Sequence, residues 1–123
     1  MNTPAQKPEP NWFQQLQEFE AKRPTIRKAG IEALTRLVPV AQRDTGQSAV
    51  IGRFLLGLYN GRDYPFVLTS LRGLDTALFD DCLAVLQLDY SPEQEVHTYV
   101  PEGDAIWAES IGTWAGNGRR NAQ

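Results

Sequence analysis

Residues 43–89 read RDTGQSAVIGRFLLGLYNGRDYPFVLTSLRGLDTALFDDCLAVLQLD, and this stretch decides the fold. Apolar residues fill 47–59 and leave almost no polar face, a composition typical of a helix that other helices surround. The preceding DTG run can cap its start and the following NG pair its end. Asp75 is an N-cap for another apolar helix, which the pattern extends to Asp89. The stretch therefore predicts two packed helices, with 47–59 at the centre of an all-α fold.

Several positions within this stretch predict how its elements pack. Gly52 and Gly57 interrupt a helical pattern at a cost of roughly 1 kcal/mol each, which the close approach of a neighbouring helix would explain. The loop over 62–74 is apolar and stiffened by Pro65, so we expect it to pack down and to contain one helical turn from Thr69 to Gly73. The side chains expected to point inward are Tyr64, Phe66, Leu68 and Leu71 from the loop and Leu78, Phe79, Cys82, Leu83, Val85 and Leu86 from the second helix.

Before this stretch the pattern predicts two helices separated by a proline. Asn11 can cap the first, which ends before Pro24. Thr25 can cap the second, and Pro39 should produce a kink or break near Leu37, because proline removes one backbone hydrogen bond and crowds the preceding turn.

After this stretch the pattern is less definite. The run SPEQ at 91–94 is typical of a helix start, whereas the alternation over 95–100 also fits a strand; we favour the helix. Asp104 begins a last helix, which docks onto the core through Ile106, Trp107, Ile111 and Trp114. The sequence thus predicts an all-α, compact single-domain bundle of five or six helices over 11–114, between flexible ends at 1–10 and 115–123.

The composition fits one folded domain without covalent cross-links. The chain has 123 residues, 41% of them hydrophobic and 22% charged, which are ordinary values for a globular protein. Cys82 is the single cysteine, so an internal disulfide is excluded, and its apolar neighbours predict a buried, inert thiol. The sequence shows no apolar leader and no segment able to span a bilayer, so we expect a soluble cytoplasmic protein without membrane contact.

The charges are unevenly distributed along the chain. Residues 1–62 contain nine basic and five acidic side chains, whereas residues 63–123 contain three basic and ten acidic ones. The first interpretation is that the two halves pack together and partly neutralise each other. The second is a basic face for an acidic partner, or head-to-tail self-association.

The residues that could perform catalysis do not form a recognisable set. His97 is the only histidine, and Glu93 lies one helical turn before it, but no nucleophile accompanies them. Asp80 and Asp81 diverge by about 100° on a helix, so we expect them on a solvated face rather than around one proton. The spacings of metal sites and of phosphate-binding loops are also missing. We therefore predict no catalytic, cofactor-binding or metal-binding residue.

One segment resembles a DNA-binding motif. Residues 40–53 place an alanine, a glycine turn and a β-branched residue at roughly the spacing of a helix-turn-helix. The glycine falls one position late, and the second helix would expose only Gln47, Ser48 and Arg53 before becoming wholly apolar. A DNA-reading helix needs a polar side, so the core-helix interpretation is favoured.

Five strings in order resemble a known family: AQRDTGQS, FLLGLYNG, LRGLD, DDCLAVLQLD and then EVH. They look like a family of small, uncharacterised bacterial proteins that often occur on integrative elements and other mobile DNA. The resemblance spans about Leu34 to Val100, and leaves out the N-terminal helix and the tryptophan-containing tail. It implies a bacterial cytoplasmic setting and an accessory role in mobile-element biology, and it supplies no functional residues.

The leading hypothesis is a non-enzymatic module that binds a protein partner or associates with itself. Its candidate surface is the basic outer face around Lys28, Arg36 and Arg43, extended by Gln47 and Arg53, or else the acidic C-terminal half. The alternative is a DNA-binding protein that uses Arg43, Gln47, Ser48 and Arg53. An enzyme centred on His97 is the third hypothesis.

Overall fold

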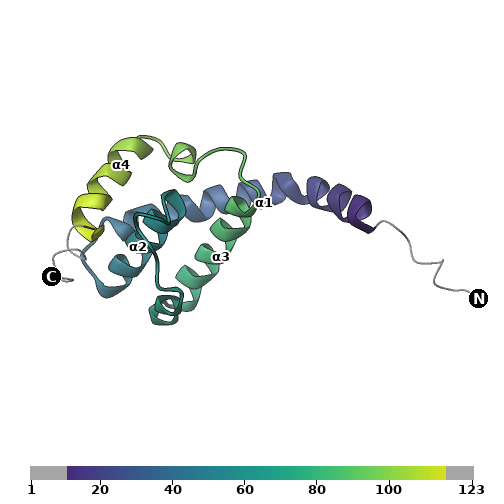
Figure 1. The fold of residues 1–123 in the computed structure, drawn as a ribbon. Coiled ribbons are helices and arrows are strands. Elements are labelled where there is room, and N and C mark those ends of the chain that lie inside the picture. The colour runs from purple at the N-terminus through teal and green to yellow at the C-terminus, as the bar shows by residue number, and fades with distance from the viewer. Residues whose placement is uncertain (1–10, 116–123) are drawn as a thin grey trace, which may run out of the picture.

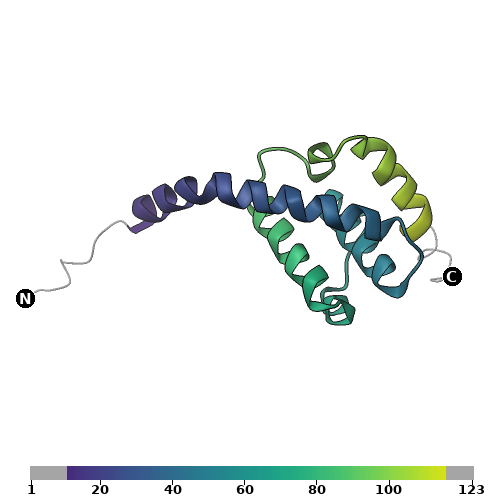
Figure 2. The same ribbon diagram turned by 180° about the vertical axis from the view of Figure 1, so that it is seen from behind.

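A single long helix, α1 (Asn11–Ala41), runs the length of the computed structural model, which describes residues 11–115 (Figure 1). The other elements pack against its C-terminal part, while its N-terminal part projects beyond them (Figure 2). Over these residues the fold is all-α, as predicted, and no strand occurs. The remaining elements are α2 (Gly46–Tyr59), η2 (Leu68–Gly73), α3 (Thr76–Tyr90), η3 (Val96–Tyr99), α4 (Gly103–Ser110) and the π-helical η4 (Ile111–Ala115).

The prediction of two helices before residue 42 is wrong. α1 continues through both Pro24 and Pro39 and ends only at Ala41. Each proline leaves the carbonyl group four residues before it, that of Glu20 or Thr35, without its helical hydrogen bond. Both prolines are exposed, and Glu20 and Thr35 are also residues that water can reach. The helix therefore continues, and the ribbon bends in its N-terminal part instead of breaking (Figure 2).

α2 begins and ends close to the predicted bounds and forms the centre of the core. Thr45 caps its start, where the Thr45 hydroxyl oxygen accepts from the Ser48 amide at 3.0 Å. At its end the amide of Asn60 donates to Leu56. The core side chains are contributed by all four α-helices, by η3 and by η4; they include Leu34, Leu37, Ile51, Phe54, Leu56, Cys82, Val85, Val96, Trp107 and Trp114.

The close approach of a neighbouring element explains why residue 52 is a glycine, as predicted. A Cβ atom there would overlap the indole ring of Trp114 in η4. The buried Trp114 indole N–H donates to the carbonyl of Ala41 at 3.1 Å, at the end of α1 where helical partners run out. Gly57 faces Phe66, so the neighbour there is the loop over 62–74 rather than a helix.

The loop over 62–74 and α3 do not bury all of the side chains that were predicted to point inward. η2 supplies the expected helical turn, but Leu68 is 71% exposed, whereas Tyr64, Phe66 and Leu71 pack against the core as predicted. Asp75 caps α3 as predicted, with its carboxylate accepting from the Leu78 amide at 2.9 Å. Cys82 and Val85 are buried, whereas Phe79, Leu83 and Leu86 point outward with more than a third of their surface exposed.

The segment after α3 forms neither the predicted helix from Ser91 nor a strand. It contains only η3, a short 3-10 turn over Val96–Tyr99. The last helix begins at Gly103, one residue before the predicted Asp104, and Glu102 enters it with a left-handed backbone (φ 59°). Gly103 is required there because a Cβ atom would collide with the carbonyl of His97.

The predicted flexible ends, 1–10 and 115–123, lie outside the described residues except for Ala115, which is the last residue of η4.

Candidate functional site

Arg36, at the middle of the predicted basic face, is joined to a carboxylate of α3. Its Nε donates to Asp81 Oδ2 at 3.1 Å and its Nη2 to Asp81 Oδ1 at 2.9 Å. The hydrogen bonds to Asp81 raise the pKa of the Arg36 guanidinium. The Asp81 side chain is 12% exposed, so the prediction of a solvated Asp80-Asp81 face is wrong for Asp81, which points under the guanidinium. This pair ties α1 to α3, and the charge of Arg36 is neutralised within the molecule.

The other basic candidates are not brought together into one surface. Lys28 and Arg43 are exposed and have no ion pair among residues 11–115. The guanidinium of Arg53 lies over the ring of Trp114, 5.9 Å from its centroid. Arg53 therefore covers the packing of η4 on α2, and among the candidates Lys28, Arg43 and Arg53 keep a charge that no carboxylate in residues 11–115 neutralises.

The start of α2 does not offer the polar face that a DNA-reading helix needs. The Gln47 side-chain carbonyl accepts from the Asp75 amide at 2.7 Å, so Gln47 joins α2 to the start of α3. Ser48, expected to be exposed, is completely buried, and its hydroxyl lies 2.8 Å from that of Thr45. Two of the four residues of the DNA hypothesis thus hold the fold together instead of facing outward.

His97 occupies a packed corner between α2 and α4. Its ring meets Tyr59 edge to face at 5.1 Å between centroids and lies 6.3 Å from Trp107. Nε2 lies 3.2 Å from Asp104, whose side chain is 97% exposed, and the buried Nδ1 has no partner among the described residues. Glu93, one helical turn before His97 in the sequence, does not reach the ring, because the segment is not a continuous helix and Glu93 pairs with arginines of α1.

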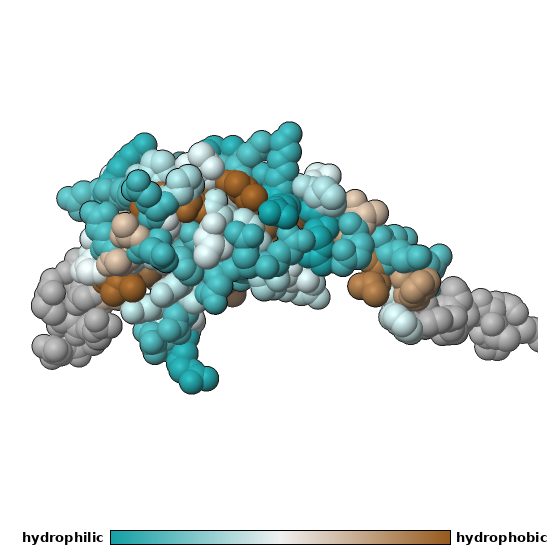
Figure 3. Space-filling view, turned by 90° about the horizontal axis from the view of Figure 1, so that it is seen from above, coloured by the Kyte–Doolittle hydropathy of each residue, from teal (hydrophilic) through white to brown (hydrophobic). Residues whose placement is uncertain are grey.

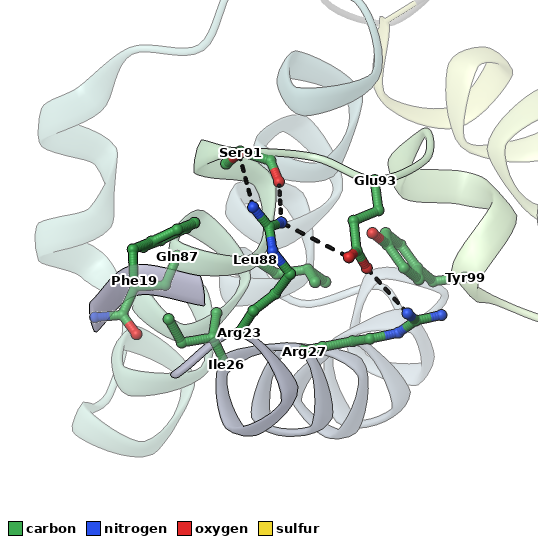
Figure 4. A pocket seen from close by; sticks show the side chains of 9 residues that line it. All are labelled: Phe19, Arg23, Ile26, Arg27, Gln87, Leu88, Ser91, Glu93 and Tyr99. Carbon is green, nitrogen blue, oxygen red and sulfur yellow. Dashed lines mark hydrogen bonds and ion pairs between the residues drawn. The ribbon is translucent and has the colours of Figure 1, made fainter. Parts of the chain in front are cut away.

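Those arginines anchor the segment after α3 (Figure 4). Arg27 donates to Glu93 at 2.9 Å, and Arg23 lies 3.7 Å from the same carboxylate. Arg23 also donates to the Ser91 carbonyl at 3.1 Å. Together with Arg36 and Asp81, these contacts join basic residues of the first half to acidic residues of the second. The interpretation that the two halves neutralise each other is therefore supported.

The other groups that could support chemistry are isolated. Cys82 is buried, as predicted, and burial raises the pKa of its thiol to about 12, so the reactive thiolate is suppressed. Burial and then Glu95 raise the pKa of Asp89, which lines an open hollow beside Leu58 and Pro92. Among residues 11–115, no group of three His, Cys, Asp or Glu side chains is placed to hold a metal ion.

The largest unexplained feature is the projecting end of α1, residues 11–22, which we name the arm. Residues 11–18 are all exposed, yet they include Trp12 (63% exposed), Phe13 (51%) and Leu16 (49%). Trp12, Leu16 and Phe19 follow one another at four and three residues, so they share one side of the helix, which Phe13 flanks. We name these four residues the arm stripe; brown and tan surface gathers near this end of α1 in Figure 3.

A second apolar stripe runs along the outer side of α3. Phe79, Leu83, Leu86 and Tyr90 recur at four, three and four residues, so they lie on one side of that helix. They are 36–40% exposed, except for Tyr90 at 81%. The two stripes meet where Phe19 contacts Tyr90 edge to face, 6.2 Å between centroids. Together they form one apolar surface along α3 and the arm.

Sequence reasoning missed this surface because it placed Phe79, Leu83 and Leu86 in the core and assigned no surface to the apolar residues at 12, 13, 16 and 19. One signal was available. Residues 11–17, NWFQQLQ, contain two aromatic residues and no charge, which is unusual for a helix end that faces water. A second signal was the apolar face of α3, which is wider than the packing of this helix on one neighbouring helix requires.

Fold and surface define a small helical domain that bears an exposed apolar face and a projecting helical arm. The chain belongs to DUF7673, a family of unknown function, which matches residues 31–115. The match includes Trp107 and Trp114, so the expectation that the tryptophan-containing tail lies outside the family is wrong. It also includes the α3 stripe, whereas the arm precedes it.

No curated protein and no solved structure matches the chain. Over residues 11–115, no helix combines the length and the apolar character that a membrane span requires.

Proposed function

We propose that this protein is a non-enzymatic protein-interaction module that binds its partner through the arm stripe and the α3 stripe. The observation that carries the proposal is the continuous apolar surface joined at Phe19 and Tyr90. Exposed apolar patches larger than a few hundred Å² are rare on monomeric proteins and typically mark interaction sites. Aromatic residues are enriched and charged residues depleted at the centres of such interfaces, as they are over residues 11–17.

The polar candidates support this choice over the basic face first considered. Arg36 and Gln47 already bind groups within the molecule, and Arg53 covers Trp114. Lys28 and Arg43 are exposed and can contribute to a polar rim. The burial of Ser48 likewise weighs against a DNA-reading α2, and the isolation of His97 and Cys82 weighs against catalysis.

The biological setting is also a proposal. The likeness of strings such as AQRDTGQS and DDCLAVLQLD to bacterial proteins of mobile elements supports an accessory role in the bacterial cytoplasm. The partner would then be a protein of that setting, or another copy of the chain.

Site-specific photo-crosslinking in the native host tests the proposed function. A benzophenone amino acid at Leu16 should give a discrete covalent adduct with a protein, because Leu16 lies at the middle of the arm stripe. The matched control is the same residue at Gln14, which is exposed on the same helical turns but points about 160° away. Equal labelling from both positions, or no adduct from Leu16, would overturn the proposal.

A further inference from the structure

We infer that the partner of this apolar surface is a second copy of the chain, and that the arm of each copy lies along the α3 stripe of the other. This inference rests on the proposed function and names the occupant of the same surface. It is carried by the isolation of the arm, by the area of the two stripes and by their arrangement on one molecule.

A contact along the arm stripe would stabilise the helical form of the arm. Residues 11–18 are exposed, and the ring of Phe19, directly after them, contacts Tyr90 of α3. Isolated helical segments shorter than about 12–15 residues are marginal in water, and their stability in proteins comes mainly from packing of an apolar face. The helical form of the arm is therefore expected when its stripe is covered.

The arm cannot cover its own molecule's α3. The stripe of α3 ends at Tyr90, beside Phe19, and the arm extends from there about 10 Å farther away at 1.5 Å per residue. The segments at 1–10 and 116–123 read MNTPAQKPEP and GNGRRNAQ, and Met1 is their only large apolar residue. Neither of these two segments has an apolar run that matches either stripe.

The area fits a dimer. Aromatic residues and leucines present about 150–250 Å² each when fully exposed, so the exposed fractions of Trp12, Phe13, Leu16 and the α3 stripe amount to about 700 Å² per molecule. Stable interfaces bury about 800 Å² per partner. The apolar area available to two copies is therefore close to what a stable dimer needs.

The arrangement of the stripes fits a two-fold axis. Each molecule carries one arm and one receiving helix, which meet at Phe19 and Tyr90. A two-fold axis near this junction places each arm on the other molecule's α3, so both contacts form at once and the assembly closes. An arm-to-arm dimer would leave both α3 stripes exposed.

The oligomeric state of the full chain tests the inference. Light scattering after size exclusion at about 50 µM should give twice the 13.8 kDa chain mass. Leu16→Glu and Leu83→Lys should each raise the dimer dissociation constant roughly 100-fold, since each dimer carries the change in two contacts worth about tenfold each. Gln14→Glu, which adds the same charge on the opposite side of the arm, should have no effect.

Mixing the two variants distinguishes the exchanged arrangement from other dimers. A heterodimer of Leu16→Glu with Leu83→Lys has one unchanged arm contact and one in which the new charges are opposite. Dimer mass should therefore return on mixing. Neither residue is buried, so circular dichroism should show both variants folded.

Three results would overturn the inference. They are a monomeric wild-type chain at this concentration, a dimer that Leu83→Lys leaves intact, and failure of the mixed variants to associate. A monomeric chain that still gives a Leu16 crosslink to a different protein would refute self-association and leave the proposed function standing. Absence of any Leu16 adduct would refute both.

Discussion

The two ends of α1 are the same helix in two different environments. Towards the C-terminus, Leu34 and Leu37 are fully buried among α2 and α3. Towards the N-terminus, Leu16 and Trp12 show the same helical spacing of apolar residues and are about half or more exposed. The difference shows that an apolar stripe specifies a buried face but not which molecule covers it. The buried part holds the domain together, and the exposed part is left for binding.

Truncating a leucine at each end should give the largest contrast. Leu34→Ala should lower the free energy of unfolding by about 2–5 kcal/mol, because it leaves a cavity in the core. Leu16→Ala should change the value for the monomer by less than about 0.5 kcal/mol. Urea denaturation at low protein concentration measures both. A large loss from Leu16→Ala under monomeric conditions would show that the arm packs on its own molecule.

A methyl group at Gly52 should have the next largest effect. Gly52→Ala would push Trp114 away and weaken its bond to Ala41, at a cost of about 1–3 kcal/mol. Gly46→Ala is the matched control, because a Cβ atom there meets nothing within 4 Å. We expect Gly46→Ala to be neutral or stabilising by up to about 1 kcal/mol. Thermal denaturation and tryptophan fluorescence report the two effects, and equal behaviour of both variants would contradict the packing of η4 on α2.

The ion pair between α1 and α3 should have a smaller effect. Asp81→Asn should cost about 1–2 kcal/mol, because a charged acceptor of two arginine hydrogen bonds is lost. Asp80→Asn, on the exposed neighbour, should leave the unfolding free energy unchanged. Chemical denaturation compares the two. A loss shared equally by both would indicate general charge effects instead of this pair.

The smallest expected effect is at Asp89, near the end of α3. Burial and Glu95 raise its pKa above the ordinary value of 3.8, so the folded state favours the protonated form. The charged form is therefore less stable at pH 7, and this penalty is lost as pH falls through the raised pKa towards 3.8. Asp89→Asn should stabilise by about 0.3–1 kcal/mol at pH 7, since a negative charge near a helix C-terminus is also unfavourable. The gain should vanish near pH 3, and a gain that persists there would rule out this cause.

Local signals in the sequence predicted those features of the fold that depend on residues only a few positions apart. The capping of α2 by Thr45 and of α3 by Asp75 follows from side chains that bond amides three positions later. The all-α class and the central place of α2 followed from apolar spacing. The continuity of α1 did not follow, because an interior proline can either kink a helix or break it, and the exposure of Glu20 and Thr35, which lose a carbonyl hydrogen bond here, is a property of the tertiary structure.

The candidate site was predicted less well. Basic side chains at 36 and 53 were identified, but their partners Asp81 and Trp114 lie 45 and 61 positions later in the sequence, beyond the reach of helical spacing. The apolar surface was missed because spacing identifies a stripe without showing how many neighbours the helix has. The family match likewise supplied membership without a binding residue.

The sequence by itself therefore determined the secondary structure class, the caps of α2 and α3, the burial of Cys82 and the need for glycine at position 52. Only the tertiary structure decided that Arg36 is neutralised, that Gln47 joins two helices, and that the arm and α3 stripes are exposed. The physical reason is that capping and periodicity depend on neighbours within a helical turn or two, whereas burial and pairing depend on which distant segments meet.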